Sequence, residues 1–303
     1  MQKVNKLKIA VLLHGHLRNF EECADYLNNN LLSHYDCDVF IHTWDALDHN
    51  SETWHGQRIE ASVVDKKLEE IITTKYHPKG LIIEHQEKYP FEKSITGLRY
   101  VPELRFSSAI PYFMFYSTEK ANKLRLEYEK QEGISYDYIV VTRPDVRLKR
   151  YFNMEYYLNE ANIIGLDKDV CRFFGSFEDL SIGGITLCRS NDLFFFAKPN
   201  VIDKYIEINK VLTDEEIKKY GLTMVSMYTA KEIHAGILPI PLTYSMPKDW
   251  DYGETHSVES RTNRPYSRLK KTIYKIGSTL LYPIFWLQKK YRYLNYYEYK
   301  KRF

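Results

Sequence analysis

The sequence lacks several features that would assign it to a specialised class. No apolar segment approaches the roughly 20 residues that span a bilayer, and no internal repeat or low-complexity segment stands out. The four cysteines are far apart, and none forms a C-x-x-C pair or a Cys/His cluster with zinc spacing. They are Cys23, Cys37, Cys171 and Cys188. We therefore expect reduced core cysteines in a cytosolic protein.

The N-terminal apolar run is also short. Lys3, Lys6 and Lys8 precede or begin it, but Ile9 to Leu13 is much shorter than the apolar region of a signal peptide. We expect this run to be a first β-strand and the chain not to be secreted.

The composition is typical of a globular protein of 303 residues, with 44% hydrophobic and 27% charged residues and a mean hydropathy of -0.46. This length suggests one large or two ordinary domains. Aromatic residues are frequent, at 15% with 26 Tyr. They would suit stacking on sugars or bases, core packing or a membrane interface, and composition does not separate these uses.

Charge is distributed unevenly along the chain. The segment from Arg261 to Phe303 has 12 Lys or Arg against one acid, whereas the rest has 31 Lys or Arg and 39 Asp or Glu. An acidic body with a basic tail needs a separate explanation for the tail. We expect a body over 1–250 and a tail over 251–303, joined by a polar hinge at 248–265.

Strand and helix patterns alternate along the body, which predicts an α/β layer fold. We expect strands at 8–13, 38–42, 80–84, 138–141, 161–166, 193–197 and 237–242. We expect helices at 20–32, 63–72, 107–132, 199–211, 214–220 and 223–234, with a loop at 87–104.

The segment from Tyr136 to Leu148, YDYIVVTRPDVRL, is the most informative of the chain. Its apolar residues predict a buried strand, which Pro144 ends because proline has no N–H to donate. Arg143 and Asp145 then follow at the carboxyl end, where ligands bind in open α/β sheets. The pair suggests an anionic substrate such as a nucleotide diphosphate, with or without a bound metal, or else a simple surface ion pair.

Polar residues follow two other predicted strands, at 15–19 and 42–45. Parallel strands bring their carboxyl ends to one edge, so these clusters should converge with Arg143 and Asp145. Gly15 would let the backbone approach a ligand, and Arg18 offers a bidentate fork for phosphate. Asn19 is a candidate ligand contact or a plain N-cap of the following helix.

Four further residues at these strand ends are candidate substrate contacts. His14 and His42 are not spaced as a metal pair, and each could also be a structural histidine. Trp44 could stack on a base or pack in the core. Asp45 is better placed to bind a ribose hydroxyl than to act as a base.

Together, the segments HGHLRNF, DVFIHTWD, YSTEKANKLRLEYE and YDYIVVTRPDVRL resemble bacterial surface-polysaccharide biosynthesis proteins. This group includes the WavE-like lipopolysaccharide and capsule proteins, which look like GT-A-type glycosyltransferases. The resemblance covers 8–148 well and the remainder weakly. It implies a GT-A-like open mixed sheet flanked by helices, a nucleotide-sugar donor and transfer to a lipid-linked polysaccharide such as capsule, O-antigen or lipopolysaccharide.

The resemblance also places Arg143-Pro144-Asp145 where GT-A enzymes have Asp-x-Asp, with Arg143 replacing the first Asp. Asp145 would hold Mg²⁺ or Mn²⁺ only if diphosphate oxygens and waters complete the coordination shell. Alternatively, Arg143 and Arg147 neutralise the leaving diphosphate without a metal. Metal dependence is open at this point.

An inverting transfer needs a carboxylate that deprotonates the acceptor hydroxyl. Asp192, in SNDLFFFAKP, resembles the Asp of a strand segment that follows the central motif in this family, although it could be a turn or cap residue. Asp179 lies in the Gly- and Ser-flanked loop FFGSFEDLSIGG, which could be an acceptor loop or only a solvated one.

The tail over 267–303 has the pattern of a basic amphipathic helix, with Pro283 as a kink. Apolar and aromatic residues beside many Lys and Arg are typical of a helix on anionic lipid, or of one docked on an acidic body. We expect a peripheral protein on the inner face of the bacterial plasma membrane. The alternatives are transfer of a phosphoryl-type substituent to the polysaccharide and a non-enzymatic membrane- or nucleic-acid-binding protein, although no nucleic-acid motif is present.

Overall fold

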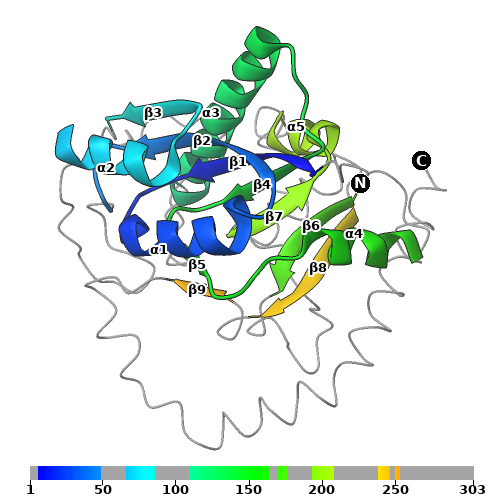
Figure 1. The fold of residues 1–303 in the computed structure, drawn as a ribbon. Coiled ribbons are helices and arrows are strands. Elements are labelled where there is room, and N and C mark those ends of the chain that lie inside the picture. The colour runs from blue at the N-terminus through cyan, green and yellow to red at the C-terminus, as the bar shows by residue number, and fades with distance from the viewer. Residues whose placement is uncertain are drawn as a thin grey trace, which may run out of the picture. The chain divides into compact units, whose positions relative to one another are not determined.

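An open mixed β-sheet lies at the centre of the fold (Figure 1). The computed structural model describes residues 6–48, 66–85, 109–163, 170–175, 193–207, 238–245 and 250–252. These residues belong to one compact unit, which spans Met1–Glu178 and Cys188–Gly253.

Seven strands form the main sheet, and all but one run parallel. In spatial order they are β3 (Gly80–Glu84), β2 (Asp36–Trp44), β1 (Lys8–His14), β4 (Tyr138–Thr142), β7 (Phe194–Ala197), β6 (Val170–Gly175) and β8 (Leu238–Ser245). β7 is antiparallel to both of its neighbours. A separate two-stranded ladder joins β5 (Val146–Leu148) to β9 (Trp250–Tyr252). The predicted α/β open mixed sheet is thereby confirmed.

Helices cover both faces of the sheet. One apolar cluster packs it against α1 (Phe20–Leu27), the π-helical η1 (Asn28–Leu32), α2 (Lys66–Tyr76) and the start of α4 (Met154–Ile163). The other packs it against α3 (Ala109–Glu132) and α5 (Pro199–Glu207). Alternate residues of β1 belong to opposite clusters, Ile9 and Val11 to the first and Ala10 and Leu12 to the second, because strand side chains alternate between faces.

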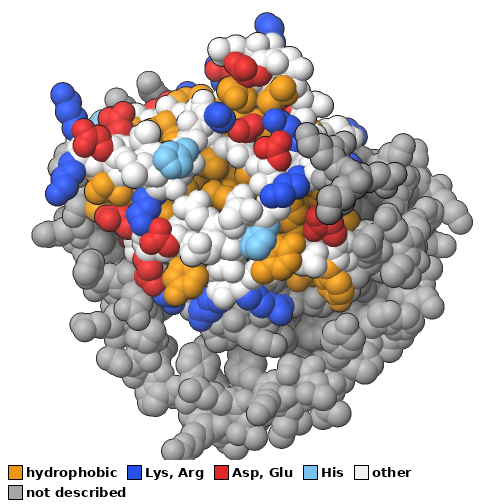
Figure 2. Space-filling model, in the orientation of Figure 1, with side chains coloured by type: hydrophobic (Ala, Val, Ile, Leu, Met, Phe, Trp, Pro, Cys, Tyr) orange, Lys and Arg blue, Asp and Glu red, His pale blue; other side chains and the backbone are white. Residues whose placement is uncertain are grey.

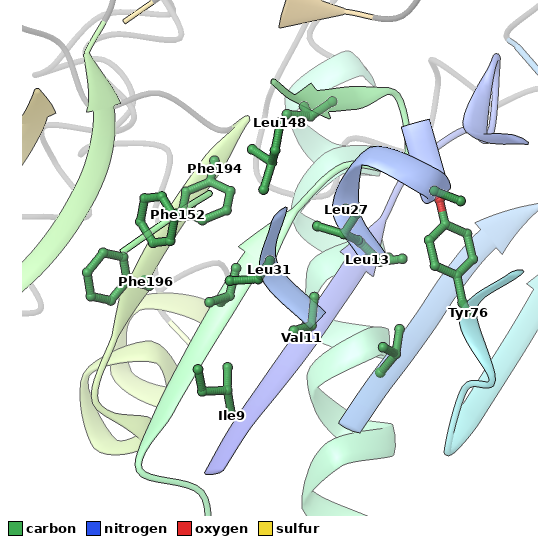
Figure 3. Packing of buried hydrophobic residues seen from close by; sticks show 14 of the residues in the cluster. Ile9, Val11, Leu13, Leu27, Leu31, Tyr76, Leu148, Phe152, Phe194 and Phe196 are labelled. Atoms are coloured by element: carbon green, nitrogen blue, oxygen red, sulfur yellow. The ribbon is translucent and has the colours of Figure 1, made fainter. Parts of the chain in front are cut away.

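The first cluster shows how densely the sheet is covered (Figure 3). Leu27 and Leu31 pack over β1, while three fully buried phenylalanines, Phe152, Phe194 and Phe196, close the cluster beyond β4. The rings of Phe152 and Phe194 meet edge to face with centroids 4.9 Å apart. Burying each such side chain contributes about 1.5–3 kcal/mol, so this cluster fixes β4 and β7 firmly in place.

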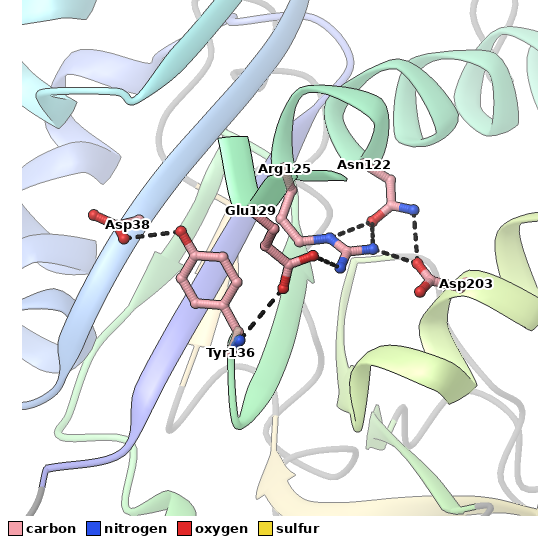
Figure 4. A network of polar contacts seen from close by, with 6 residues as sticks. All are labelled: Asp38, Asn122, Arg125, Glu129, Tyr136 and Asp203. Carbon is pink, nitrogen blue, oxygen red and sulfur yellow. Dashed lines mark hydrogen bonds and ion pairs between the residues drawn. The ribbon is translucent and has the colours of Figure 1, made fainter. Parts of the chain in front are cut away.

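A buried ionic network ties α3 to α5 on the other face (Figure 4). The Arg125 side chain is 1% exposed and donates from Nε and Nη2 to Asn122 Oδ1, at 3.0 and 2.9 Å. Its Nη1 donates to Glu129 Oε2 at 2.5 Å, and Nη2 forms an ion pair with Asp203 of α5. Glu129 in turn accepts from the Tyr136 backbone N–H at 3.3 Å, just before β4. The network therefore links α3, α5 and the chain just before β4.

The outer surface carries charges of both signs. On the face seen in Figure 2, Asp and Glu side chains lie among Lys and Arg, with hydrophobic side chains between them. Such mixing is usual for a solvated surface. Within the described part of the chain, no helix combines the length and apolarity that crossing a membrane requires.

Most sequence-predicted elements that fall on described residues are present. The strands at 8–13, 38–42, 80–84, 138–141, 193–197 and 237–242 correspond to β1, β2, β3, β4, β7 and β8, and the helix at 107–132 corresponds to α3. Gly133 ends α3 with a left-handed φ of 65°, as a C-terminal glycine should. The helices at 20–32, 63–72 and 199–211 are confirmed over their described parts.

Two predictions were wrong, and three strands were missed. Ala161 to Ile163 end α4 rather than beginning a strand, because a short apolar run fits either element. The predicted hinge contains β9, which pairs with β5. β6 was not predicted either. The helices expected at 214–220 and 223–234, the loop at 87–104 and the tail helix at 267–303 lie outside the described residues.

Candidate functional site

The carboxyl ends of β1 and β4 lie side by side at the point where the sheet order reverses. β1 pairs with β2 on one side and with β4 on the other, with Leu13 opposite Thr142. In open α/β sheets, ligands bind in the crevice at this topological switch point. The turn after β1 and the turn after β4 therefore form the candidate site.

A tight turn follows β4. The Val146 N–H donates to the Arg143 carbonyl at 3.3 Å, with Pro144 and Asp145 between them. Proline favours the second position of such a turn because its ring fixes φ. The turn brings the Arg143 side chain onto Asp145, where Nε donates to Oδ1 at 2.8 Å and Nη2 forms an ion pair with Oδ2.

The turn after β1 supplies a second arginine. Arg18 Nη1 donates to Asp145 Oδ2 at 2.5 Å, and Arg18 Nε donates to Asp48 Oδ1 at 3.2 Å. We call Arg18, Asp48, Arg143 and Asp145 the switch-point cluster. Its side chains are 19%, 14%, 20% and 2% exposed, in that order, so the Asp145 carboxylate lies deepest.

The backbone of the first turn is conformationally unusual. Gly15 has a φ of 93° and Arg18 a φ of 47°. A positive φ is available to glycine but costs about 1–2 kcal/mol for a residue with a Cβ. The Arg18 N–H donates to the Leu47 carbonyl at 2.9 Å, which helps to hold this conformation. Residues in such strained conformations cluster at active and binding sites.

Two opposing influences act on the pKa of the Asp145 carboxyl group. Burial raises the pKa of Asp145 above the usual range for an aspartate, whereas the charge and hydrogen bonds of Arg143 lower it. Asp48 adds a smaller upward contribution to the pKa of Asp145. Burial outweighs the opposing effect of Arg143, so the pKa of Asp145 is raised overall.

These residues do not fit a divalent ion at Asp145. Mg²⁺ and Mn²⁺ bind oxygen lone pairs, but both Asp145 oxygens already accept from guanidinium groups. Two positive charges, on Arg18 and Arg143, lie against the carboxylate and would repel a divalent cation. Elsewhere among the described residues, no group of three or more His, Cys, Asp or Glu is arranged to hold a metal.

Comparisons with known proteins add no family assignment. No family model and no curated protein matches this chain. Function must therefore be argued from the site itself.

A second polar network lies beside the switch-point cluster, between the ends of β1, β2 and β3 and helix α3. The Ser117 hydroxyl is buried, accepts from the Gly15 N–H at 2.8 Å and lies 2.7 Å from His42 Nδ1. His42 Nε2 lies 3.4 Å from Glu84 Oε2. Glu84 also accepts from the Tyr116 hydroxyl at 2.7 Å, in the same network.

Protonation in this network follows from burial. Desolvation lowers the pKa of His42 to about 4, despite the opposing charge of Glu84. Burial raises the pKa of Glu84, but hydrogen bonds from Tyr116 and from Lys120, whose Nζ lies 3.0 Å from Oε1, outweigh it and lower the pKa overall. At neutral pH we therefore expect neutral His42 beside ionised Glu84. Through the bond from the Gly15 N–H to Ser117, this network holds the turn after β1 in place.

The sequence-predicted contacts at 14–19 and 42–45 are brought to the same edge of the sheet, but three of them are buried. The residues His14, His42 and Trp44 are 2%, 0% and 4% exposed, so they offer almost no surface to a ligand. Trp44 stacks on Tyr116 with ring centroids 5.8 Å apart. Asp45 is partly exposed, and its Oδ2 lies 2.5 Å from His85 Nδ1.

Asn19 and Arg147 differ from the expected arrangement. Asn19 is the N-cap residue of α1 but makes no side-chain cap hydrogen bond. Arg147 forms an ion pair with Glu22 of α1, and its guanidinium lies 5.4 Å from the centre of the Tyr26 ring. Arg147 thus contacts α1 rather than Asp145. The candidate bases Asp179 and Asp192 lie outside the described residues.

Sequence reasoning missed several members of these networks. Glu84 is the last residue of β3, so it is another polar residue at the carboxyl end of a strand. That position could have identified it as a candidate site residue. Asp48 lies only three residues after Asp45. Ser117 and Tyr116 lie inside a helical pattern, and nothing in that pattern distinguishes them from ordinary helix residues.

Proposed function

We propose that this protein is a GT-A-like glycosyltransferase that moves a sugar from a nucleotide-sugar donor to a lipid-linked surface polysaccharide. The observation that carries the proposal is the switch-point cluster, where Arg18 and Arg143 from two separate turns meet on one buried carboxylate. Guanidinium forks suit diphosphate oxygens, and the switch point is where an α/β sheet binds nucleotides. The resemblance of 8–148 to WavE-like proteins supports the same donor class.

The proposed chemistry breaks the bond between the sugar C1 and the diphosphate oxygen. Negative charge grows on the departing nucleoside diphosphate, and Arg18 and Arg143 would stabilise it electrostatically. The acceptor hydroxyl attacks C1 and loses its proton to a carboxylate base. Asp192 is our candidate for that base and Asp179 the second choice, both from sequence alone.

Partly exposed groups near the cluster would complete donor recognition. Asp45 lies after β2, on the side of the sheet edge away from Arg143, where a ribose hydroxyl could reach it. Gly15 has no atom within 4 Å of the position of an added Cβ, which leaves room beside its backbone. We assign these residues to the sugar–nucleotide side of the donor.

A donor panel tests the proposal directly. Purified full-length protein should be titrated by calorimetry with UDP, GDP, CDP, ADP and dTDP, and with their sugars. We expect one nucleotide class to bind with micromolar to millimolar Kd and its sugar to yield a glycosylated lipid-linked product in bacterial membrane extract. Binding of none of them, or a product that carries a phosphoryl group instead of a sugar, would overturn the proposal.

A further inference from the structure

Asp145 occupies the position at which the family resemblance implies a metal ligand, yet its surroundings are those of an anchored counter-ion. Oδ1 accepts from Arg143 and Oδ2 from Arg18, and the side chain is 2% exposed. A metal ligand must direct lone pairs at the ion, and three guanidinium N–H groups already occupy most of the roughly four lone-pair positions of this carboxylate.

The arginines are more accessible than the carboxylate that holds them. Arg18 and Arg143 are 19% and 20% exposed, about ten times the exposed fraction of Asp145. Solvent or a ligand can therefore contact the two guanidinium groups more readily than the carboxylate that they cover. Partial burial strengthens their electrostatic action because it lowers the effective dielectric constant.

Asp145 also sets the geometry of the arginines. It bridges the turn after β1, which carries Arg18, and the turn after β4, which carries Arg143, so both guanidinium groups meet at one carboxylate. A guanidinium has five N–H donors, and the Arg18 side chain uses only Nε and Nη1 toward described residues. Its Nη2 donates to no described protein atom.

We propose that Arg18 and Arg143, oriented by Asp145, bind the donor diphosphate in place of a divalent ion, so that donor binding is independent of metal. The proposal rests on the proposed function and goes beyond it by assigning the counter-charge. Asp145 is then a positioning residue, and the Asp-x-Asp type of ion bridge is absent from this site. Charge-assisted forks from two arginines supply the contacts that a bridging cation would otherwise make.

Calorimetric titration of the full-length protein with the best-binding nucleoside diphosphate, and with inorganic pyrophosphate, tests this in EDTA and in MnCl₂. We expect the nucleoside diphosphate Kd in EDTA to lie within about threefold of its value in Mn²⁺. Binding that is lost in EDTA and restored by Mn²⁺ would overturn the inference while leaving the proposed function intact. Absence of nucleotide binding in both buffers would overturn the function as well.

Variants then separate positioning from metal binding. Losing one charge-assisted fork should raise the Kd about tenfold in Arg143→Lys, equally in EDTA and Mn²⁺. Asp145→Asn should also raise the Kd in EDTA, measured well below its unfolding midpoint because loss of this buried charge lowers stability too. Lys79→Ala removes a charge at the opposite, amino end of the sheet and should leave the Kd unchanged. If Asp145→Asn instead leaves binding in EDTA unaffected and abolishes only a Mn²⁺ enhancement, Asp145 is a metal ligand and the inference fails.

Discussion

Arg18 combines a strained backbone with a paired side chain, and both properties point to ligand binding. Its φ of 47° is unfavourable for a residue with a Cβ, while its guanidinium holds Asp145 and Asp48. Arg143 reaches the same carboxylate from another turn. Two arginines from separate turns thus meet on one buried carboxylate, and we propose that they bind the donor diphosphate.

Protonation of His42 should affect stability in the acidic range. Its pKa is about 4 in the folded protein and 6.5 for an ordinary histidine. Between these values the unfolded chain binds a proton that the folded protein does not, so stability falls as pH drops from 6.5 toward 4. The loss should approach roughly 3 kcal/mol at pH 4. Urea unfolding at pH 7.0, 5.5 and 4.5 measures it.

Matched histidine variants identify the source of this pH dependence. His42→Asn should flatten the decline, while His34→Asn, at an exposed position, should keep it. Because His42→Asn also disturbs the contact with Ser117, the His42 ring should in addition be titrated by NMR in the unmodified protein. A His42 pKa near 6.5 in that titration would refute the account of this network.

At the scale of elements, the joints between helices and sheet depend on buried polar groups as well as on apolar packing. Arg125 links α3 to α5, and Ser117 links α3 to the turn after β1. Tyr35, just before β2, is linked to the start of α4, because its hydroxyl accepts from the Met154 N–H at 2.8 Å. Of these joints, the one made by Ser117 contacts the turn that carries Arg18.

Replacing Arg125 should therefore be costly. Arg125→Met leaves Glu129 and Asp203 without their buried cation, and breaking such a pair typically costs about 3–5 kcal/mol. The control Lys123→Met removes an exposed partner of Glu127 one turn away, which should cost less than about 0.5 kcal/mol. Guanidinium chloride unfolding of both variants measures the difference. Equal stabilities would show that the Arg125 network is not a structural joint.

The elements that the sequence predicted are those with strong local patterns. β1 and β4 are continuous apolar runs, which is how strands buried on both faces appear. For the same reason, the face on which His42 lies was not predictable, because apolar neighbours on both sides remove the alternation. β5 and β9 are three-residue strands that exist through mutual pairing about 100 residues apart, and no local pattern encodes that.

The candidate site was predictable in outline for a geometric reason. Parallel strands bring their carboxyl ends together, so the convergence of Gly15 and Arg18 with Arg143 and Asp145 followed from strand assignment alone. Which charged group meets which depends on turn conformation, such as the positive φ of Arg18. Likewise, the ion pair of Arg147 with Glu22 depends on the packing of β5 beside α1, which the sequence pattern does not encode.

At the scale of the whole molecule, the sequence divides charge between an acidic body and a basic tail. We propose that the tail binds the anionic inner face of the plasma membrane and brings the site to a lipid-linked acceptor. Each Lys near such a surface contributes about 1 kcal/mol, so removing three should weaken binding about 100-fold. Sedimentation of the full-length protein with phosphatidylglycerol vesicles measures this for the triple variant Lys270→Gln, Lys271→Gln and Lys275→Gln.

A matched triple variant controls for total charge. Lys66→Gln, Lys67→Gln and Lys79→Gln remove the same charge from the body and should leave vesicle binding within about threefold, because these side chains are not part of the tail. Equal losses in the two triple variants would show that net charge, and not the tail, drives membrane association.

The most direct measurement of the central claim is a crystal structure of the full-length protein with the tightest-binding nucleoside diphosphate, grown in EDTA. The account predicts the diphosphate at the sheet edge between the ends of β1 and β4, with its oxygens accepting from Arg18 and Arg143. A nucleotide bound at another place, or a diphosphate at this edge without contact to either arginine, would contradict it.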